Sequence, residues 1–445
     1  MNRHHLKSIS KAFITKRFIA VVVLVHLLFL FGLSSMASAA DEIPGAPQIA
    51  GNSGILMDAE TGQILYQYNA DAPLPPASMS KMMTEYLVSK AVKQGTVSWT
   101  DTVKIGENAA KQIGSRILLA QGDQHTIREL YIAMAVYSAN DATVQLAEVV
   151  GGSEAGFVKM MNDAAAELGM TASHFINATG LDRADMPEKY RPAESGETLM
   201  SARDSAVLAY HILKEEPEFL ETSKIQEYKF RPRDKVPMKN WNWMLESNVN
   251  NPTLKKFAYP GVDGLKTGHT SSAGNCFTGT ALQNGTRLIA VVMGVPGGVN
   301  DGKRFLETAK LFDYGFHSFE KKTIVQAKAV VPGYEKLKVK KGKSTKLPVV
   351  TATDVTVMVP KGQAVEPTVQ EVKPASDPLV APITLGDKVG TVTYKYKDPS
   401  TQSDKTVTID LIASEDVSKA SWWRLMFRGI GNFFSGLFHG IVDLF

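Results

Sequence analysis

The stretch PPASMSKMMTEYLVSKAV, residues 75–92, takes the chain from a proline break into an apolar run with the pattern of a helix. Its first turn carries Ser78-Met79-Ser80-Lys81, a spacing that places the serine and the lysine on one face of a helix. A serine hydroxyl becomes a good nucleophile only when a neighbouring base takes its proton. Lys81 could do so if burial or a nearby cation kept its amine neutral. The same spacing recurs at residues 8–11 and 318–321, but only the copy at Ser78 follows a proline break and opens an apolar helix.

Two further short motifs lie downstream. Ser138-Ala139-Asn140 is the only S-x-N sequence in the chain, and Lys266-Thr267-Gly268 is the only K-[ST]-G sequence. In the first, a hydroxyl could relay a proton and an amide could hold a peptide group of a substrate. In the second, we expect a strand that ends with Lys266 and Thr267, which could bind a carboxylate, while Gly268 would let a substrate backbone approach closely. Taken singly, the S-x-N motif is more often an ordinary polar turn, and the K-T-G motif is typical of a surface strand.

Segments with a β pattern flank a mainly helical middle between residues 100 and 250. This order predicts an α+β domain over residues 41–322, with an inserted helical lobe. The expected elements are two strands in 53–68 around a turn at Glu60-Thr61-Gly62, helices that include 127–150 and 155–168, strands at 262–267, 273–283 and 287–294, and a helix at 302–319.

The composition changes after residue 322. Short alternations of Val, Thr and Lys separated by Gly and Pro turns predict a small all-β domain over residues 323–413. No constellation typical of an active site occurs there. The expected strands are 336–340, 355–359, 389–396 and 406–412.

The last segment, residues 414–445, is assigned to an amphipathic helix. From residue 417 onward, aromatic and aliphatic residues recur at helical spacing, and polar residues fall on the opposite stripe. Such a helix, with cations near its start, is typical of a membrane interface, and its polar stripe argues against spanning a bilayer. The alternative is a helix that docks on the protein's own β domain.

The first 40 residues have the order of a secretory signal: a basic region, an uncharged apolar run over 18–33, and the small residues Ala37-Ser38-Ala39-Ala40. We therefore expect residues 1–40 to be removed on export, with an uncleaved anchor as the alternative. This segment carries five bases and no acid, so the net charge of +4 belongs to it, and the remaining 44 bases face 45 acids. A nearly neutral mature chain does not support nucleic-acid binding through bulk charge.

Neither a disulfide nor a metal site is expected. Cys276 is the only cysteine, and it lies beside an apolar stretch, which favours a buried thiol over a reactive one. The histidines are scattered, and no H-E-x-x-H or C-x-x-C spacing occurs. No cofactor is expected either.

The three motifs occur in the order S-x-x-K, S-x-N and K-T-G, which is far more specific than any one of them. With this set the chain resembles the serine D-alanyl-D-alanine carboxypeptidases, low-molecular-mass penicillin-binding proteins of the superfamily that includes the β-lactamases. Residues 174–181 (HFINATGL), 261–270 (GVDGLKTGHT) and 273–281 (AGNCFTGTA) are similar to segments of this family. The resemblance covers essentially the whole mature chain. It implies a β-lactamase/transpeptidase-like catalytic domain, then a small all-β domain and a C-terminal amphipathic helix.

The resemblance also implies roles for the motif residues. Ser78 would attack the D-Ala-D-Ala bond of peptidoglycan stem peptides, and Lys81 would be its general base. Ser138 and Asn140 would assist proton transfer and substrate positioning. The remaining implied groups bind the substrate: Lys266 and Thr267 hold the terminal carboxylate, Gly268 admits the backbone, and the N–H groups of Ser78 and His269 form an oxyanion hole. β-Lactams would acylate Ser78, on the outer face of the cytoplasmic membrane, where residues 417–445 would attach the protein.

Three alternatives share parts of this pattern. A β-lactamase needs fast deacylation, but Glu188, Glu194 and Glu197 form no clear E-x-x-x-N arrangement, and Ala139 departs from S-D-N. A D,D-endopeptidase or transpeptidase would carry the same three motifs. A non-catalytic cell-wall-binding protein is disfavoured because Ser78, Lys81 and Lys266 are all intact.

Overall fold

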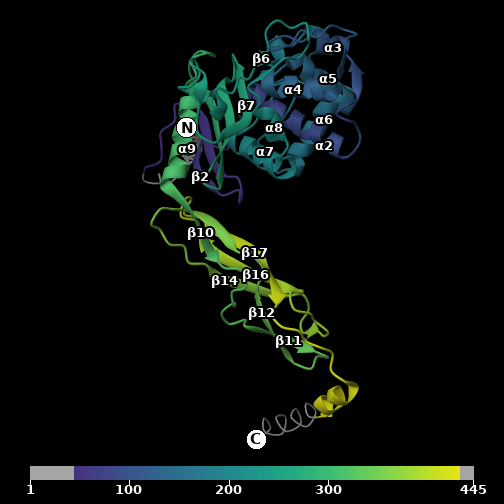
Figure 1. Ribbon diagram of the computed structural model, residues 1–445, viewed down its shortest axis with the longest axis vertical. Coiled ribbons are helices and arrows are strands. Elements are labelled where there is room, and N and C mark those ends of the chain that lie inside the picture. Colours follow the sequence, from purple (N-terminus) through teal and green to yellow (C-terminus); the bar gives the residue numbers. More distant parts are fainter. Residues whose placement is uncertain (1–44, 431–445) are drawn as a thin grey trace, which may run out of the picture. The chain divides into compact units, whose positions relative to one another are not determined.

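A five-stranded antiparallel sheet is the centre of the N-terminal part of the chain in the computed structural model, which describes residues 45–430 (Figure 1). Its order is β2-β1-β9-β8-β7, so β1, the first strand of the chain, pairs both with β2 and with β9, which follows the helical middle. This arrangement confirms the predicted α+β class. The strands are β1 (Ser53–Asp58), β2 (Ile64–Tyr68), β7 (Val262–Thr270), β8 (Gly274–Gln283) and β9 (Thr286–Val295).

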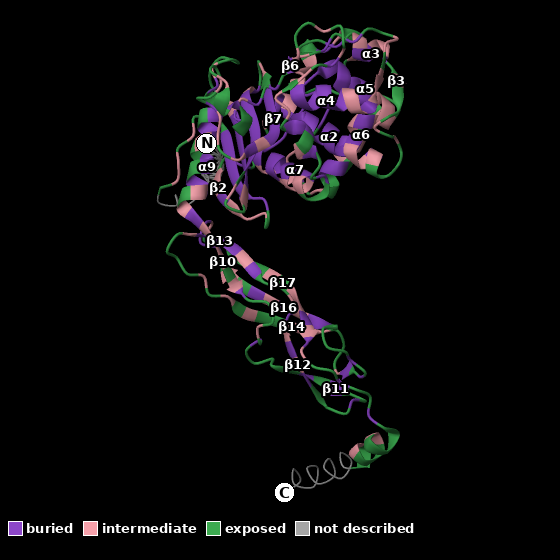
Figure 2. Ribbon diagram, in the orientation of Figure 1, coloured by how far each residue is buried: buried purple, intermediate pink, exposed green. Residues whose placement is uncertain are grey.

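Alternate residues of the central strands face two different cores. Ile55 of β1 packs with the lobe helices, whereas its neighbour Leu56 packs with Phe312 of α9 (Lys303–Ser318). Successive side chains of a strand point to opposite faces, so this sheet is buried on both sides. The result is a sheet covered by α9 on one face and by α2 (Lys81–Lys93) and α7 (Ala202–Glu215) on the other (Figure 2).

The inserted lobe holds most of the remaining helices of the described residues. Its central helix α4 (Ile127–Tyr137) begins with a capping box, in which the Thr126 hydroxyl accepts from the Glu129 backbone and the Glu129 carboxylate accepts from the Thr126 backbone. The other lobe elements are α3 (Glu107–Ala110), α5 (Asn140–Gly151), α6 (Glu154–Glu167), α8 (Phe219–Ser223), the 3-10 turns η2 (Arg183–Asp185), η3 (Glu188–Tyr190) and η4 (Glu246–Asn250), and the short ladders of β3 (Thr102–Lys104) with β4 (Gln124–Thr126) and β5 (Glu227–Tyr228) with β6 (Met238–Lys239).

The helix expected over residues 127–150 is broken in two. Ser138 ends α4 in the left-handed conformation, with φ 60° and ψ 33°, and the chain starts again as α5 two residues later. A left-handed residue cannot continue a right-handed helix. The break therefore turns the S-x-N motif from a helix face into a corner.

A separate β domain follows α9. It contains a six-stranded sheet, β14-β16-β17-β12-β11-β15, and a two-stranded ribbon of β10 and β13. Alternation buries one side chain in two, for example Leu337 and Val339 of β11. The chain enters it at Phe319, slightly before the predicted residue 323. Its strands are β10 (Phe319–Val325), β11 (Lys336–Lys340), β12 (Lys346–Thr351), β13 (Val355–Pro360), β14 (Thr368–Pro374), β15 (Leu379–Val380), β16 (Lys388–Lys397) and β17 (Asp404–Ala413).

The C-terminal helix begins at Trp422, later than residue 414, and is described as far as Ile430. Before it, Val417 pairs with Ile383 and is buried in the core of the β domain, as Ala420 also is buried. Within residues 45–430 no helix is both long and apolar enough to cross a membrane. The signal expected over residues 1–40 and the tail beyond residue 430 lie outside the described residues.

Candidate active site

Ser78 and Lys81 lie at the point where a 3-10 turn passes into a helix. The turn η1 (Ala77–Ser80) carries the serine, and Lys81 is the first residue of α2. The Lys81 Nζ lies 2.8 Å from the Ser78 Oγ and donates a second bond of 2.8 Å to the Thr179 carbonyl. The amine is thus held against the hydroxyl by a main-chain carbonyl 98 residues away in the chain.

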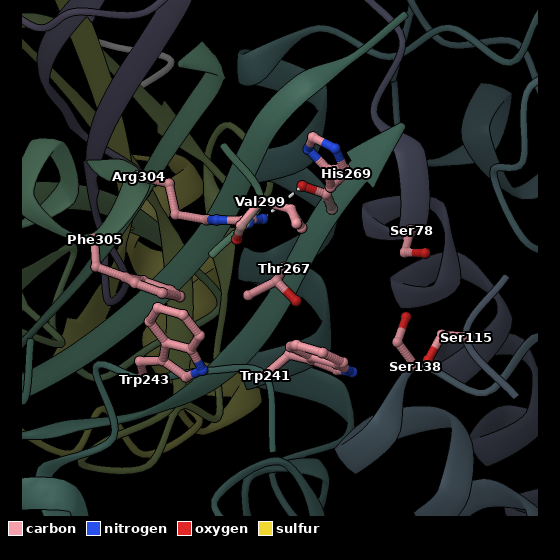
Figure 3. Close-up of a pocket in the computed structure, with 11 residues that line it drawn as sticks. Ser78, Ser115, Ser138, Trp241, Trp243, Thr267, His269, Val299, Arg304 and Phe305 are labelled. Atoms are coloured by element: carbon pink, nitrogen blue, oxygen red, sulfur yellow. Dashed lines mark hydrogen bonds between the residues drawn. The ribbon is translucent and has the colours of Figure 1, made fainter. Parts of the chain in front are cut away.

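Ser138 lies beside Ser78 at the edge of a small cavity, and Thr267 and Trp241 face the two serines (Figure 3). Lys266 lies within β7, not at the end of a strand as predicted, and its Nζ donates to the Ser138 Oγ at 2.9 Å. The same Nζ donates to the Thr267 carbonyl at 3.1 Å. The three sequence motifs therefore meet at one site, which holds two serine–lysine pairs, Ser78 with Lys81 and Ser138 with Lys266.

Burial dominates the electrostatics of both lysines. The Lys81 side chain is fully buried, and burial holds its pKa well below the usual value. The Lys266 ammonium lowers the Lys81 pKa further, while Glu85 and Asp141 act in the opposite direction. Burial also lowers the pKa of Lys266, and Glu85 opposes that shift. A lysine in such surroundings can carry a neutral amine, the form that accepts a proton from a hydroxyl.

Glu85 is a buried carboxyl one helical turn beyond Lys81. It has no exposed surface, and neither of its Oε atoms has a hydrogen-bond partner among the described residues. Burial raises its pKa, and the Lys266 and Lys81 ammonium groups counteract this. Two lysines and one acid thus form a buried cluster beside the nucleophile.

The corner at Ser138 is fixed by the carbonyl of Tyr137. This oxygen accepts a bond of 2.7 Å from the Ser115 Oγ and one of 3.1 Å from the Trp241 Nε1. The Asn140 Nδ2 donates to the Ile113 carbonyl at 2.6 Å, and its buried Oδ1 has no partner. The amide oxygen of Asn140 is therefore the atom of that side chain left to meet a ligand.

Two glycines allow β7 and the segment 174–181 to approach the nucleophile turn. A Cβ on Gly268 would lie 2.4 Å from the Pro76 carbonyl oxygen, and one on Gly180 would lie 1.9 Å from the Ala77 oxygen. Gly180 also has a φ of +75°, which favours glycine. Asn177 stabilises this turn, because its Oδ1 accepts from the Gly180 N–H at 2.7 Å.

The cavity beside Ser78 and Ser138 has a volume of about 150 Å³. Aromatic side chains form much of its wall, and Arg304 supports it by donating to the Gly268 carbonyl at 2.8 Å. The lining residues are Ser78, Ser115, Ser138, Trp241, Trp243, Thr267, Gly268, His269, Val299, Arg304 and Phe305.

The catalytic part of the chain, residues 40–297, matches the family model described as D-alanyl-D-alanine carboxypeptidase. The chain belongs to the D-alanyl-D-alanine carboxypeptidase family. Residues 319–419 match a second model, the C-terminal domain of penicillin-binding protein 5. The resemblance found in the sequence is thereby confirmed, and the protein is a serine-type D-alanyl-D-alanine carboxypeptidase.

Relatives of this carboxypeptidase match over nearly the whole chain. D-alanyl-D-alanine carboxypeptidase DacF of Bacillus subtilis is 33% identical over 417 residues, which cover 94% of this chain and 98% of DacF. The crystal structure of a peptidoglycan synthesis regulatory factor (PBP3) from Streptococcus pneumoniae has a TM-score of 0.71 at 30% identity and covers 84% of this chain and 100% of its own. Penicillin binding protein 5 from Haemophilus influenzae has a TM-score of 0.65 at 31% identity, over 84% and 99% of the two chains.

Several residues of this carboxypeptidase site carried no signal of their own in the sequence. Ser115, Trp241 and Arg304 act on main-chain carbonyls, which no motif reveals. The segment with Thr179 and Gly180 stands out in the sequence only by its resemblance to the carboxypeptidase family, and Glu85 stands out only as part of an apolar helix. The i, i+4 spacing from Lys81 to Glu85 is the one pattern that could have identified a candidate.

Cys276 is an inert, buried thiol. The thiol is fully buried, accepts a bond from the Gly294 N–H, and has a pKa that burial raises to about 11. Among residues 45–430, no group of three or more His, Cys, Asp or Glu side chains could hold a metal ion.

Proposed function

We propose that this carboxypeptidase removes the terminal D-Ala of peptidoglycan stem peptides through an acyl-enzyme on Ser78. The observation that carries the proposal is the 2.8 Å contact between the Ser78 Oγ and the buried Lys81 Nζ, whose pKa is lowered by burial. Lys81 takes the serine proton as the Oγ attacks the carbonyl carbon of the D-Ala-D-Ala bond. The resulting oxyanion is stabilised by the backbone N–H groups of Ser78 and His269, each worth about 3–4 kcal/mol.

Departure of D-alanine requires a proton on its amine. The Ser138 hydroxyl, which accepts from Lys266 at 2.9 Å, relays to that amine the proton that Lys81 took from Ser78. The C–N bond breaks, free D-alanine leaves, and the shortened peptide stays as an ester on Ser78. A water molecule then attacks the ester, with Lys81 again as base, and restores the free hydroxyl.

Substrate binding involves the remaining motif residues. Lys266 and Thr267 bind the terminal carboxylate, since a lysine ammonium beside a hydroxyl suits an anion. Gly268 leaves room for the peptide backbone, and the unpartnered Asn140 Oδ1 accepts from a substrate N–H. The aromatic walls restrict the cavity to a small side chain such as that of alanine.

β-Lactams are proposed to acylate Ser78 in place of the peptide. Penicillin-binding protein D2 from Listeria monocytogenes, 32% identical over 61% of this chain, has been solved in an ampicillin-bound form. In this chain the Ser78 Oγ, held against the Lys81 Nζ, would attack the lactam carbonyl and open the ring. Slow attack of water on that ester would make the drug an inhibitor.

The location of the enzyme is also a proposal. Residues 1–40 would direct export, residues 41–322 would act on the outer face of the cytoplasmic membrane, and residues 323–413 would link them to the membrane-binding tail. Stem peptides and the membrane surface are the proposed partners; nucleic acid is not among them.

The proposal is tested by release of D-alanine from an acyl-L-Lys-D-Ala-D-Ala peptide, with the Ser78→Ala variant as control. The expected result is release by the parent enzyme and none by the variant, and covalent labelling by penicillin that is lost in the same variant. A Ser78→Ala protein that still binds labelled penicillin covalently would refute the assignment of the nucleophile. Hydrolysis of a β-lactam without release of D-alanine would instead favour a β-lactamase, and peptide transfer or cross-link cleavage would favour a transpeptidase or endopeptidase.

A further inference from the structure

The hairpin of β11 and β12 is the most basic segment of the described chain. Six lysines occur between residues 336 and 346, and this range contains no acid. We call this segment the basic hairpin. All six side chains are exposed, whereas Leu337 and Val339 between them and Leu347 directly after them are buried. The lysines of the hairpin are Lys336, Lys338, Lys340, Lys341, Lys343 and Lys346.

The cations of the basic hairpin are not neutralised by neighbouring acids. Among the described residues none of the six lysines forms an ion pair, although other lysines of the same domain do, as Lys388 does with Asp410 at 2.7 Å and Lys395 with Asp404 at 2.7 Å. Lys338 and Lys346 lie directly opposite each other across the hairpin. Like charges in this position destabilise a sheet, so the hairpin keeps its charge at a cost in stability.

The C-terminal helix starts on this hairpin. The Arg428 guanidinium donates to the carbonyls of Gly342 and Lys343, at 3.1 and 3.2 Å. The backbone joins the two segments as well, since the Ala420 N–H donates to the Lys341 carbonyl at 2.8 Å and the Lys343 N–H to the Ser418 carbonyl at 2.8 Å. The turn of the hairpin and the first turns of the helix are therefore one surface.

Large apolar side chains of the helix stand exposed beside these cations. Trp422, Trp423 and Phe427 are 61%, 53% and 65% exposed, and the two indole rings stack with their centroids 3.7 Å apart. Exposed apolar groups at this density mark a binding surface. Aromatic rings next to lysines and arginines match the boundary of a bilayer, where rings enter the interface and cations meet lipid phosphates.

We propose that the basic hairpin binds the headgroups of anionic phospholipids, so that the β domain itself, and not the C-terminal helix alone, contacts the membrane. This inference rests on the membrane attachment proposed above and adds to it the class of lipid and a second binding element. An anionic polymer of the cell wall would also attract lysines. The exposed indole and phenyl rings on the same surface favour the lipid, because a polyanion offers them no apolar phase.

The test compares two sets of four substitutions in the full chain. The first, Lys338→Gln, Lys340→Gln, Lys341→Gln and Lys343→Gln, removes charge from the hairpin. The matched control removes the same charge from four exposed lysines of the same domain that form no ion pair: Lys361→Gln, Lys373→Gln, Lys397→Gln and Lys405→Gln. Every protein retains the same N-terminal segment and the same tail, so differences between them report the hairpin.

Binding is measured by co-sedimentation with phosphatidylcholine vesicles, with and without about 30% phosphatidylglycerol. We expect the parent to prefer the anionic vesicles and the hairpin variant to lose at least about tenfold in affinity for them, because each lysine near an anionic surface adds to binding. The control variant should stay within about twofold, all proteins should bind neutral vesicles alike, and high salt should remove the preference.

Three results would overturn the proposal: no loss in the hairpin variant, an equal loss in the control variant, or parent binding to a soluble anionic wall polymer that anionic vesicles cannot displace. Release of D-alanine from a soluble peptide is followed in parallel. If it persists while the vesicle result is negative, the lipid proposal fails and the proposed enzymatic function stands.

Discussion

At the scale of single residues, the site joins two buried lysines to one buried acid. Lys81 is useful as a base only while its amine is neutral, and burial together with the Lys266 charge favours that form. Glu85 acts against it, because a carboxylate nearby favours the ammonium. Two further titratable groups lie near this cluster: Tyr131 on α4, whose Oη donates to the Glu85 carbonyl, and Asp141 on α5, which raises the Lys81 pKa. The balance between these charges should set the pH at which acylation begins.

Replacement of Glu85 by Gln tests this balance. Acylation should rise with pH as Lys81 loses its proton, and loss of the carboxylate should lower the Lys81 pKa, which moves this rise to lower pH by roughly one unit. The Lys266 pKa should fall as well, so the loss of activity at alkaline pH should also move down. The measurement is the rate of acylation by a β-lactam from about pH 5 to pH 10. Glu216→Gln, a buried acid that bonds Ser89 instead, is the matched control and should leave the profile unchanged.

Gly180 offers a second test at the same scale. An alanine there would face both an unfavourable φ and a clash with the Ala77 oxygen at 1.9 Å, in the turn that carries Ser78. Gly169→Ala has the same kind of φ, +72°, with nothing within 4 Å of the added carbon. We expect Gly169→Ala to lose about 1 kcal/mol of unfolding free energy with acylation intact, and Gly180→Ala to lose about 2–4 kcal/mol and most of its acylation rate. Equal losses of unfolding free energy for the two variants in urea would show that the clash with the Ala77 oxygen does not matter.

At the scale of elements, the important feature is the break between α4 and α5. The Tyr137 carbonyl is released from the helix there and is held by Ser115 and Trp241, which come from two other segments. This arrangement aims the Ser138 hydroxyl at Lys266. The position of a proton-relaying group thus depends on a loop about a hundred residues further along the chain.

Trp241→Phe should weaken the corner at Ser138 without removing the aromatic ring that packs there. The ring keeps its contact with Tyr137, whereas the 3.1 Å bond from the indole N–H is lost, which is worth about 1 kcal/mol. We expect acylation to slow by roughly three- to tenfold, since Ser138 is no longer fixed. Trp99→Phe is the comparison and should keep the parent rate, because the Trp99 ring packs on Tyr131 in the lobe and its indole N–H bonds to none of residues 45–430. A parent-like acylation rate for Trp241→Phe in a stopped-flow penicillin assay would show that the bond from the indole to the Tyr137 carbonyl does not position Ser138.

The same elements show what a sequence can predict. The strands β7, β8 and β9 were predicted to within three residues, and β9 best of all because its Leu-Ile-Ala-Val-Val-Met run leaves little choice. The strand β12 was not predicted, because Pro348 and two polar residues hide its alternation. The split of 127–150 was not predicted either, since a left-handed serine has no sequence signature. The motif residues were identified because their own side chains carry the chemistry. The residues that support them, such as Ser115 and Trp241, bond to main-chain carbonyls and therefore form no sequence motif.

At the scale of the whole molecule, the catalytic domain and the β domain that precedes the membrane-binding tail have separate hydrophobic cores. The core around the catalytic sheet is built almost wholly from residues before 320, and that of the β domain from residues 325–417. Val417 belongs to the second core, so the separable part of the tail starts at Trp422 and not at residue 417. A function divided in this way predicts different outcomes for two truncations that differ by five residues.

Removal of residues 422–445 should release the exported protein from membranes and leave its action on a soluble peptide within about twofold of the parent, because no residue of either core is lost. Removal of residues 417–445 also deletes Val417 and Ala420, which are 3% and 6% exposed, and should lower the unfolding free energy of the β domain by about 2–4 kcal/mol. Membrane fractionation and thermal unfolding of the two proteins separate these effects. If the chain that ends at Ser421 remained on membranes in high salt, attachment would lie outside the tail and outside the salt-sensitive basic hairpin, and the N-terminal segment would have to provide it.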